Sequence, residues 1–363
     1  MKSHEIDKTL LLIVGLLSSI GLVAISSAGV VMSYNKFGYN HYYLLHQFMY
    51  GFLPGIIALL ILQKIDYRIF KKNMLLFLII TIILLFVVFI PGLGLGLKGA
   101  NRWISIAGIS FQPSEFIKLT FILYIAVWFE KNKKDFSNLL IPFIVLIFVI
   151  SIPLIKQPDV GTLSIIILTA AIMYFAYGAK IKNILLLGVG GLAGLLFLIK
   201  IAPYRMDRFM VFLHPEIDPQ GIGYQINQAL LAFGSGGLFG LGFGQSRQKF
   251  NYLPEPIGDS IFAIIGEEFG LFGLCVIVVL FLFFALRGYK IASNAPDDFG
   301  KLVAIGITSL ITFQAIINMA AITSLLPLTG IPLPFISYGG SNLIVSLAAV
   351  GILLNISKHS KAR

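Results

Sequence analysis

Long apolar runs constrain this chain more than any other feature of its sequence. Stretches almost free of charge recur along its length, and about 17–25 apolar residues suffice for a helix to cross a bilayer. Only 12% of the residues are charged, about half the share of a soluble domain. The sequence therefore predicts an all-α polytopic integral membrane protein with a single transmembrane domain over residues 1–363. The ten predicted spans are 10–32, 45–62, 74–91, 114–129, 139–155, 160–178, 184–201, 260–286, 302–325 and 342–356.

The distribution of basic residues predicts the orientation. If the N-terminus is cytoplasmic, the segments on that side of the membrane hold most of the 27 Lys and Arg and nearly all of the net charge of +11. Cytoplasmic loops are typically rich in Lys and Arg, so both termini are predicted to be cytoplasmic. The basic charge is then a topology signal, and nucleic acid is not implied. A single cysteine, Cys275, excludes an intrachain disulfide framework.

The longest polar segments all lie on the predicted outer side. They are 92–113, 202–259 between the seventh and eighth spans, and 326–341. Loops longer than about 15 residues are usually functional or disordered, and segment 202–259 is too aromatic for disorder. We predict that it packs on the outer face with short amphipathic or re-entrant helices, and that the working site opens outward.

Two predicted helices that run inward begin alike, with a proline and then a carboxylate in the first turn. Glu115 is followed three residues later by Lys118, on the same helix face. Asp159 follows Lys156 in the second case. Helix capping and a self-neutralising ion pair explain both starts without any function. If the two starts converge with Arg102, Lys118 and Lys156, they form a positive outer pocket suited to phosphates.

Three further stretches are ambiguous by themselves. Arg102-Trp103 is typical of an interfacial anchor, or of a phosphate and sugar contact. The loop 326–342 holds three prolines, Ser337, Gly339 and Gly340, and either lines a pocket or closes a hairpin. His46 and His214 have no metal-ligand partner at suitable spacing, so we predict no metal site made by the chain alone.

The densest polar stretch is 245–268. Its charged residues are Arg247, Lys249, Glu255, Asp259, Glu267 and Glu268. Asp259 lies where the long outer segment becomes the eighth span, so its carboxylate is partly desolvated yet reachable, as a general base requires. The alternative for Asp259 is helix capping. Glu267 and Glu268 lie two turns deeper, and we predict that at least one pairs with a buried cation in a structural role.

Taken in order, the motifs resemble the FtsW/RodA/SpoVE family, the SEDS polytopic glycosyltransferases that polymerise peptidoglycan. The matching pieces are Gly99–Trp103, Gln112–Glu115, Gln157–Thr162, Asp218–Gly221, Gly223–Gln225, Gly234–Gly240, Leu253–Glu255, Asp259 with Ile261–Ala263, Gly266–Glu268 and Pro327–Ser341. Segments 246–256 and 347–357 look more like the division branch (FtsW) than the elongation branch (RodA). One departure is Gly258-Asp259-Ser260 where many relatives have Thr-Asp-Phe.

The resemblance implies extension of glycan strands from lipid II at the outer face of the bacterial plasma membrane, during division or growth. It makes Asp259 the essential acid. Arg102, Trp103, Glu115, Lys118 and Asp159 fall at other recurrently important positions. From the residues themselves we add, as substrate-binding candidates, Lys156, Arg247, Lys249, Glu255, Ser337, Gly339 and Gly340.

The implied partners are a class B penicillin-binding transpeptidase, other division or elongation membrane proteins, and membrane lipids. A divalent cation, Mg²⁺ or Mn²⁺, is not readable from the residues, because diphosphate oxygens could supply most of its ligands. The alternative function is a transporter or flippase of a lipid-linked cell-wall precursor. Transporters place ionisable groups near the bilayer midplane, whereas here they gather at the outer surface. A scaffold for division proteins would leave the outer carboxylates unexplained.

Overall fold

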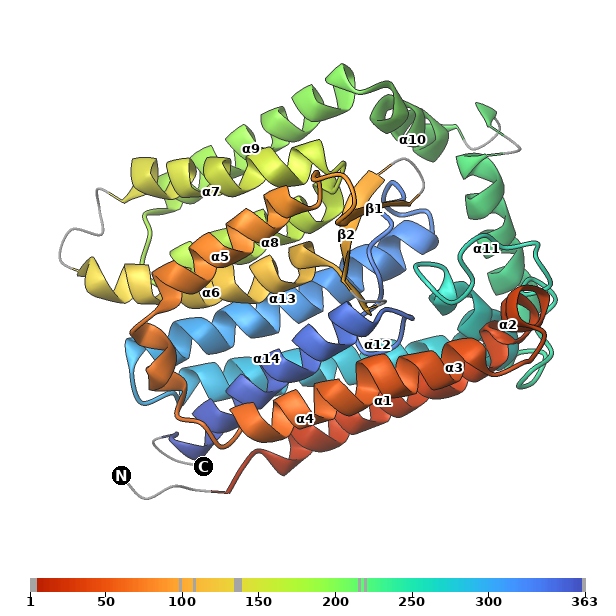
Figure 1. Cartoon of the computed structure of the whole chain (residues 1–363), viewed down its shortest axis with the longest axis horizontal. Helices are drawn as coiled ribbons and strands as arrows, with labels where there is room; N and C mark the ends of the chain where they lie inside the picture. The colour runs from red at the N-terminus through yellow and green to blue at the C-terminus, as the bar shows by residue number, and fades with distance from the viewer. Residues whose placement is uncertain are drawn as a thin grey trace.

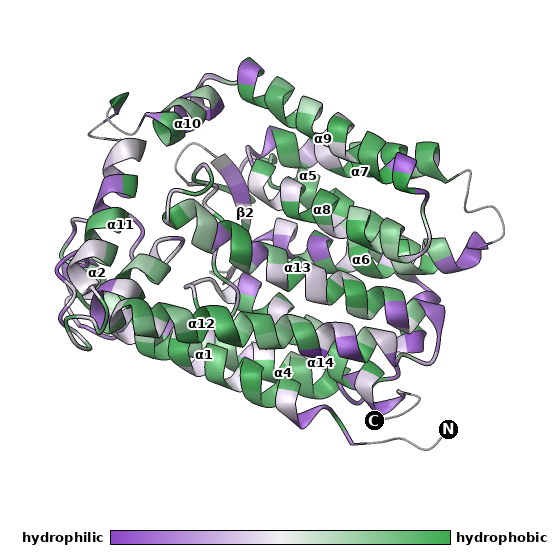
Figure 2. Ribbon diagram, turned by 180° about the vertical axis from the view of Figure 1, so that it is seen from behind, coloured by the Kyte–Doolittle hydropathy of each residue, from purple (hydrophilic) through white to green (hydrophobic). Residues whose placement is uncertain are grey.

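The computed structural model describes residues 5–97, 100–106, 109–133, 139–214, 217–218 and 221–360. The sequence motifs at Gly99, Pro219 and Gln220 therefore lie partly outside the described residues. The described chain is almost entirely helical, with long helices running side by side and both termini at one end (Figure 1). The apolar character that predicted the spans is visible along these helices in Figure 2.

Each predicted span coincides with helix. The helices are α1 (Lys8–Ala28), α3 (Tyr42–Gln47) continued by the π-helix η1 (Phe48–Phe52) and α4 (Leu53–Leu62), α5 (Met74–Val87), α6 (Pro113–Lys131), α7 (Leu140–Lys156), α8 (Val160–Ala176), α9 (Ile181–Ile201), α12 (Ile261–Ser293), α13 (Asp298–Ile322) and α14 (Gly340–Lys358). Among the described residues, six are long and apolar enough to cross a membrane: α1, the α3–α4 unit, α9, α12, α13 and α14. The count of ten crossings stays a prediction.

Burial separates central from peripheral helices. Most residues of α13 and α14 are buried, whereas α9 has no buried residue and lies at the edge in Figure 1. The central pair carries buried polar side chains, including Gln314, Asn318 and Asn342. Polar groups inside a membrane domain are costly unless they are hydrogen-bonded. These residues therefore mark positions where α13 and α14 bind other parts of the chain.

The segment 92–113 adds a small sheet to the nearly all-helical fold. It forms a three-stranded antiparallel sheet of β1 (Gly94–Leu97), β2 (Ala100–Ile106) and β3 (Ile109–Phe111). Strand β2 is central and pairs Trp103 with Leu95 and Ile104 with Phe111. Alternation of apolar with polar or glycine residues is the period-two pattern of strands, and Ile104 is the buried member. The sheet lies beside the start of α6 (Figure 1).

The long outer segment contains the expected short helices, α10 (Pro203–Leu213) and α11 (Ile222–Gly236). Helix α11 packs on α12, which is kinked at Gly270 with φ 65°. At the kink, the amides of Leu271 and Phe272 bond to the carbonyls of Gly237 and Leu238. The chain after α11 therefore satisfies the backbone groups that the kink frees.

The loop between α13 and α14 dips below the outer ends of the helices. A Cβ on Gly21 of α1 would lie 2.5 Å from the Phe335 carbonyl oxygen, and Gly21 lies seven residues before the end of α1, or about 10 Å at 1.5 Å per residue. Helix α14 also begins low, because a Cβ on Gly340 would lie 2.9 Å from the carbonyl oxygen of Tyr50. The loop 323–339 is therefore called the recessed loop, because it packs beside the middle of α1 and beside η1, and the residues around it are called the recess.

Candidate functional site

Asp259 lies in the turn that precedes α12, and three polar side chains hold that turn. The Ser337 hydroxyl donates to the Gly258 carbonyl at 2.7 Å, and the Asn318 amide donates to the carbonyl of Asp259 itself at 3.0 Å. The Gln225 amide donates to the Ser260 hydroxyl at 3.0 Å. Groups from α11, α13 and the recessed loop therefore fix the backbone that carries the carboxylate. Its Oδ2 lies 3.8 Å from where a Cβ on Gly330 would sit.

A guanidinium group outside the sequence-predicted set, that of Arg208, is electrostatically coupled to this carboxylate. Arg208, on α10, donates to the Leu328 carbonyl at 3.1 Å. Burial and the like charge of Arg102 lower the pKa of Arg208, while the negative charge of Asp259 acts in the opposite direction. Arg208 is therefore electrostatically coupled to both Arg102 and Asp259, the two residues that the sequence did predict.

Arg102 reaches across from β2 to the start of α8. Its Nε donates to the Gln157 carbonyl at 2.9 Å, and its Nη2 donates to the Pro158 carbonyl. A Cβ on Gly161, in the first turn of α8, would lie 2.8 Å from Ile331 of the recessed loop. The predicted convergence of Arg102 with the α8 start is thus confirmed, and both lie next to the loop that Asp259 faces.

The start of α6 is linked to α14 by a hydrogen bond, but its two charged side chains, Glu115 and Lys118, neutralise each other. Glu115 and Lys118 form an ion pair of 2.8 Å, each only 3% exposed. The Asn342 amide donates to the Glu115 carboxylate at 2.8 Å, and Lys118 donates to Gln314 at 2.7 Å. This network joins α6, α13 and α14, so the geometry favours the self-neutralising pair over an open phosphate contact at Lys118.

The remaining predicted residues near the α8 start differ in exposure. Asp159 is buried and its Oδ1 accepts from the Thr162 amide at 3.2 Å, as a helix cap does. Lys156, at the end of α7, is exposed. Trp103 is partly buried on β2. The structure supports capping for Asp159, and Lys156 remains an exposed side chain at the end of α7.

The loop residues predicted from the proline- and glycine-rich segment have positioning contacts. Ser337 is buried and accepts from the Leu333 amide at 2.8 Å while it donates to Gly258. The Gly339 amide donates to the Gln47 side chain at 3.0 Å. Gly340 permits close approach to the backbone of η1. These three residues shape the recess from below.

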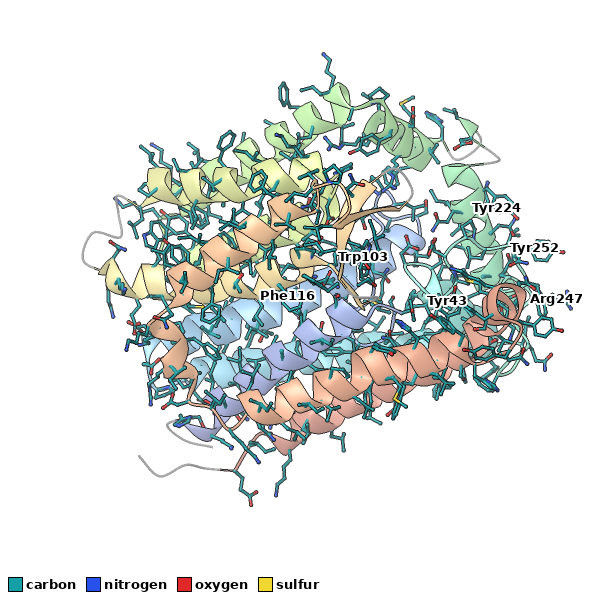
Figure 3. All side chains as sticks on the ribbon, viewed as in Figure 1. Tyr43, Trp103, Phe116, Tyr224, Arg247 and Tyr252 are labelled. Carbon is teal, nitrogen blue, oxygen red and sulfur yellow. The ribbon has the colours of Figure 1, made fainter. Side chains whose placement is uncertain are left out.

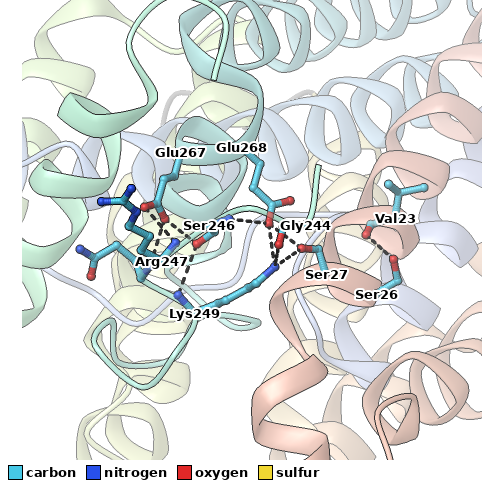
Figure 4. Close-up of polar contacts among 10 residues, drawn as sticks. Val23, Ser26, Ser27, Gly244, Ser246, Arg247, Lys249, Glu267 and Glu268 are labelled. Atoms are coloured by element: carbon cyan, nitrogen blue, oxygen red, sulfur yellow. Dashed lines mark hydrogen bonds and ion pairs between the residues drawn. The ribbon is translucent and has the colours of Figure 1, made fainter. Parts of the chain in front are cut away.

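Within the stretch 245–268, Glu267 and Glu268 belong to one cluster of polar contacts (Figure 4). Glu267 accepts from the Arg247 amide at 3.1 Å, from the Gln248 amide at 3.2 Å and from the Ser246 hydroxyl. Glu268 pairs with the buried Lys249 ammonium at 3.1 Å. The predicted buried pairing of a glutamate with a cation is confirmed.

Because Lys249 also donates to Ser27 at 3.0 Å and to the Gly244 carbonyl at 2.6 Å, its ammonium is fully used within this cluster. The Arg247 side chain is exposed and appears in the rim of the molecule in Figure 3. Glu255 lies nearer to the candidate base: its Oε2 is 3.4 Å from where a Cβ on Gly258 would sit. Glu255, unlike Lys249 and Arg247, therefore lies beside the turn that carries Asp259.

Two of the missed residues had a readable signal. Gln314 and Asn318 are polar side chains four residues apart within a predicted span, which marks a shared inward face. Gln314 donates to the Pro332 carbonyl at 2.9 Å and Asn318 to the Ile331 carbonyl at 2.7 Å. Arg208 had no such signal, since it lies in a mixed polar and aromatic segment. Within the described residues, no three His, Cys, Asp or Glu side chains gather as a metal site.

Comparisons with known proteins agree with this arrangement. Residues 7–362 match the FtsW/RodA/SpoVE family, described as a cell cycle protein. The chain is 42% identical to stage V sporulation protein E of Bacillus subtilis over 363 residues, covering 99% of each. It is 43% identical to the probable peptidoglycan glycosyltransferase FtsW of Geobacter sulfurreducens over 358 residues, covering 98% of this chain and 96% of the relative. The sequence identities to these two relatives are nearly equal, so they do not assign the chain to one rather than the other.

The fold is similar to that of a solved chain from a peptidoglycan synthase complex, studied for the structural coordination of polymerization and crosslinking. The TM-score is 0.79, with 24% identity over 99% of both chains. This likeness shows a shared fold over the whole length.

Proposed function

The chain belongs to the FtsW/RodA/SpoVE family, and from this premise we propose that it is a peptidoglycan glycosyltransferase that polymerises lipid II at the outer face of the plasma membrane. The name of the Geobacter relative supports the activity. The observation that carries the proposal is that Asp259, Arg208 and Arg102 all gather at the loop between α13 and α14. Asp259 lies near Gly330, and Arg208 donates to the Leu328 carbonyl. Arg102 bonds to the start of α8, which contacts Ile331 of the same loop.

Asp259 has the position of a general base. Its carboxylate takes the proton from the acceptor sugar hydroxyl as the hydroxyl oxygen bonds to the anomeric carbon of the donor. The bond from that carbon to the diphosphate oxygen breaks, and the lipid diphosphate leaves with both electrons. Direct displacement inverts the anomeric centre. The contacts from Ser337 and Asn318 hold the turn during this step, which keeps the base oriented.

Arg102 and Arg208 supply the positive charge for the leaving diphosphate. Both donate to backbone carbonyls in the recorded contacts, which hold a guanidinium group in place without neutralising its charge. Fixed cations aimed at developing negative charge are an effective form of catalysis. Lys118, which the sequence also suggested for this role, is instead neutralised by Glu115. A divalent cation bound by the diphosphate would find its protein ligand in Asp259, with Glu255 beside it.

The recess supports an active site on the outer side, within reach of a lipid that stays in the outer leaflet. A penicillin-binding transpeptidase is the proposed partner, because the chain has the fold found in a peptidoglycan synthase complex. The groups proposed for chemistry gather around the loop between α13 and α14, at the end of the helices opposite to that of the inner ion pairs. Transporters instead use sites near the midplane.

The test is polymer synthesis by the purified protein from labelled lipid II, with and without its cognate transpeptidase and a divalent ion. Asp259→Asn should lower polymer formation by about 100-fold or more. Asp207→Asn is the matched control, since Asp207 is an exposed acid on α10 and should retain activity. Full activity in Asp259→Asn would refute the base role. No polymer from the wild type under any condition would favour transport, and a flipping assay would follow.

A further inference from the structure

A buried amide side chain on α13, that of Gln314, joins the ion pair of α6 to the recessed loop. Gln314 is only 2% exposed. Its Oε1 accepts a hydrogen bond from the Lys118 ammonium at 2.7 Å, and its Nε2 donates to the Pro332 carbonyl at 2.9 Å. Both ends of the amide are therefore bonded, one to a charged group and one to the loop.

The two partners fix the direction in which the amide points. An ammonium group can only donate a hydrogen bond, and a backbone carbonyl can only accept one. A side chain that bonds both must therefore offer an acceptor to Lys118 and a donor to Pro332. Lys118 is itself held by Glu115 at 2.8 Å, which keeps the ammonium beside Oε1. The ion pair thus orients the Gln314 amide so that Nε2 faces the loop.

The loop segment 328–332 contacts both groups that are proposed to act in the reaction. The Leu328 carbonyl accepts from Arg208 at 3.1 Å, and Oδ2 of Asp259 lies 3.8 Å from where a Cβ on Gly330 would sit. Gly330 has φ 68°, a left-handed conformation that a residue with a side chain adopts only with strain. The cation and the base therefore share one short, tightly turned support.

Asn318 holds this support beside Gln314. It donates to the Ile331 carbonyl at 2.7 Å and to the Asp259 carbonyl at 3.0 Å. Residues four apart lie on one helix face, so α13 presents two amides to the consecutive carbonyls of Ile331 and Pro332. Asn318 bonds directly to the turn of the base, whereas Gln314 bonds only to the loop. The contribution of Gln314 can therefore be separated from that of Asp259.

We propose that Gln314 is a positioning residue for the reaction. Its amide, oriented by Lys118, fixes the segment 328–332. That segment in turn fixes the position of Arg208 relative to Asp259, and a misplacement of about 1 Å at a reacting centre can cost up to about 100-fold in rate. This inference rests on the proposed glycan synthesis. It also gives the buried ion pair of α6 a part in the reaction that needs no contact with substrate.

The inner end of the molecule offers a chemical match for Gln314. Asn355, on α14, is 1% exposed. Its amide accepts from the Tyr67 amide at 3.0 Å and donates to the Gln63 carbonyl at 2.9 Å. Asn355 therefore also uses both ends of a buried amide to hold a connecting segment, but away from the candidate site. A purely structural role for buried amides predicts the same consequences at both positions.

The experiment compares Gln314→Met and Asn355→Leu in full-length protein in nanodiscs. Each change keeps the approximate size of the side chain and removes its hydrogen bonds, and Lys118 keeps its pair with Glu115. Initial rates of polymer synthesis are measured over a range of lipid II concentrations, below the melting temperature of every variant. Gln314→Met should lower kcat about tenfold with KM unchanged, because positioning acts in the transition state. Asn355→Leu should keep the wild-type kcat.

A double variant tests the route through the loop. If Gln314 acts by placing Arg208, then Gln314→Met should lower the rate much less in an Arg208→Ala background than in the wild type, because linked residues are not additive. A residue that only stabilises the fold would give the same fold-loss in both backgrounds. That result would overturn the inference, as would a loss of kcat in Asn355→Leu as large as in Gln314→Met.

Hydrogen exchange separates this inference from the proposed function, because it requires no activity. In Gln314→Met, the backbone amides of the recessed loop should exchange about fivefold faster than in wild type, while the inner ends of α4 and α14 stay unchanged. Asn355→Leu should show the reverse. A wild type that makes no polymer would refute the proposed synthesis, and faster exchange in the loop would still support Gln314 as its anchor. Unchanged exchange of the loop in Gln314→Met would overturn the inference whatever the activity.

Discussion

The two ends of the molecule use their charges differently. At the end where both termini lie, basic side chains pair with carboxylates: Arg68 with Asp297 at 2.9 Å, Lys71 with Glu130 at 2.8 Å and Arg287 with Asp7 at 2.8 Å. In the outer recess, Arg102 and Arg208 bond to backbone carbonyls. A cation whose bonded partner is a carboxylate has its charge neutralised, while one held by carbonyls keeps charge available for an anion.

The contrast teaches that the bonded partner of a cation, more than its depth or side of the membrane, indicates its role. Lys249 and Lys118 lie on the outer side, as Arg208 does, yet each is paired with a glutamate. By this criterion they are structural. Three kinds of residue test this criterion: a glutamate-paired outer cation, an outer cation bonded to a backbone carbonyl, and a paired inner carboxylate.

The largest effect is expected at Lys249. In Lys249→Met the Glu268 carboxylate stays buried without its cation, and removing one partner of a buried pair costs about 3–5 kcal/mol of stability. The melting temperature of the purified protein should therefore fall steeply. The double variant Lys249→Met with Glu268→Gln removes both charges and should recover much of the loss. A stable Lys249→Met protein with selectively lost polymer synthesis would contradict the structural assignment and break the comparison.

The second largest effect is expected for a change at Arg208, and it should appear in the rate of polymer synthesis while stability changes little. Arg208→Ala removes a cation proposed to stabilise the leaving diphosphate, which should lower polymer synthesis by about 100-fold, comparable to removal of one stabilising donor in a transition state. The melting temperature should change little, because the Leu328 carbonyl is the recorded partner of Arg208.

Arg68→Ala and Arg247→Ala are the controls for Arg208. Arg68 is a paired inner arginine, and Arg247 is an exposed outer arginine that the sequence suggested for substrate binding. Both should retain synthesis. If Arg247→Ala lost as much synthesis as Arg208→Ala, the sequence-based choice would be right and the criterion of bonded partners would fail.

The sequence was sufficient to predict those features of the structure that depend on residues close together in the chain. Apolar runs located the helices, and the change from polar loop to apolar run located Asp259 before α12. The sequence placed 92–113 among the outer segments without predicting strands there, because glycines interrupt its alternation and the sheet depends on pairing β2 with two partners.

The environments of the other candidate site residues depend on contacts with residues that are distant in the sequence. Lys118 and Arg208 are both basic residues near the outer side, and nothing local distinguishes them. Lys118 is satisfied by Gln314, almost two hundred residues away, and Arg208 bonds to Leu328, more than a hundred residues away. The sequence therefore predicted that Arg102 converges with the α8 start, but it left open whether Lys118 is paired and did not single out Arg208.

The smallest effect is expected at Asp297, before α13 on the inner side. Burial would raise the pKa of this carboxyl, but hydrogen bonds from the Gly300 amide, Tyr67 and Arg68 outweigh it and lower the pKa below its usual 3.8. A folded-state pKa below the unfolded one stabilises the fold above the unfolded value, and the contribution is lost as the pH falls through the folded value. Asp297→Asn should therefore lower stability at neutral pH, and the difference from wild type should vanish in acid.

The size of the effect follows from exposure. The side chains of Arg68 and Asp297 are 35% and 24% exposed, so solvent screening limits their pairing to less than about 1 kcal/mol. Melting curves of wild type and Asp297→Asn between neutral and acidic pH measure it, with Asp298→Asn as the control because that carboxylate is 41% exposed. Polymer synthesis at neutral pH should be unchanged, since a neutralised inner pair has no charge to offer a substrate. Lost synthesis in Asp297→Asn without a lower melting temperature would show that paired inner charges also serve the reaction, and the contrast between the two ends would no longer hold.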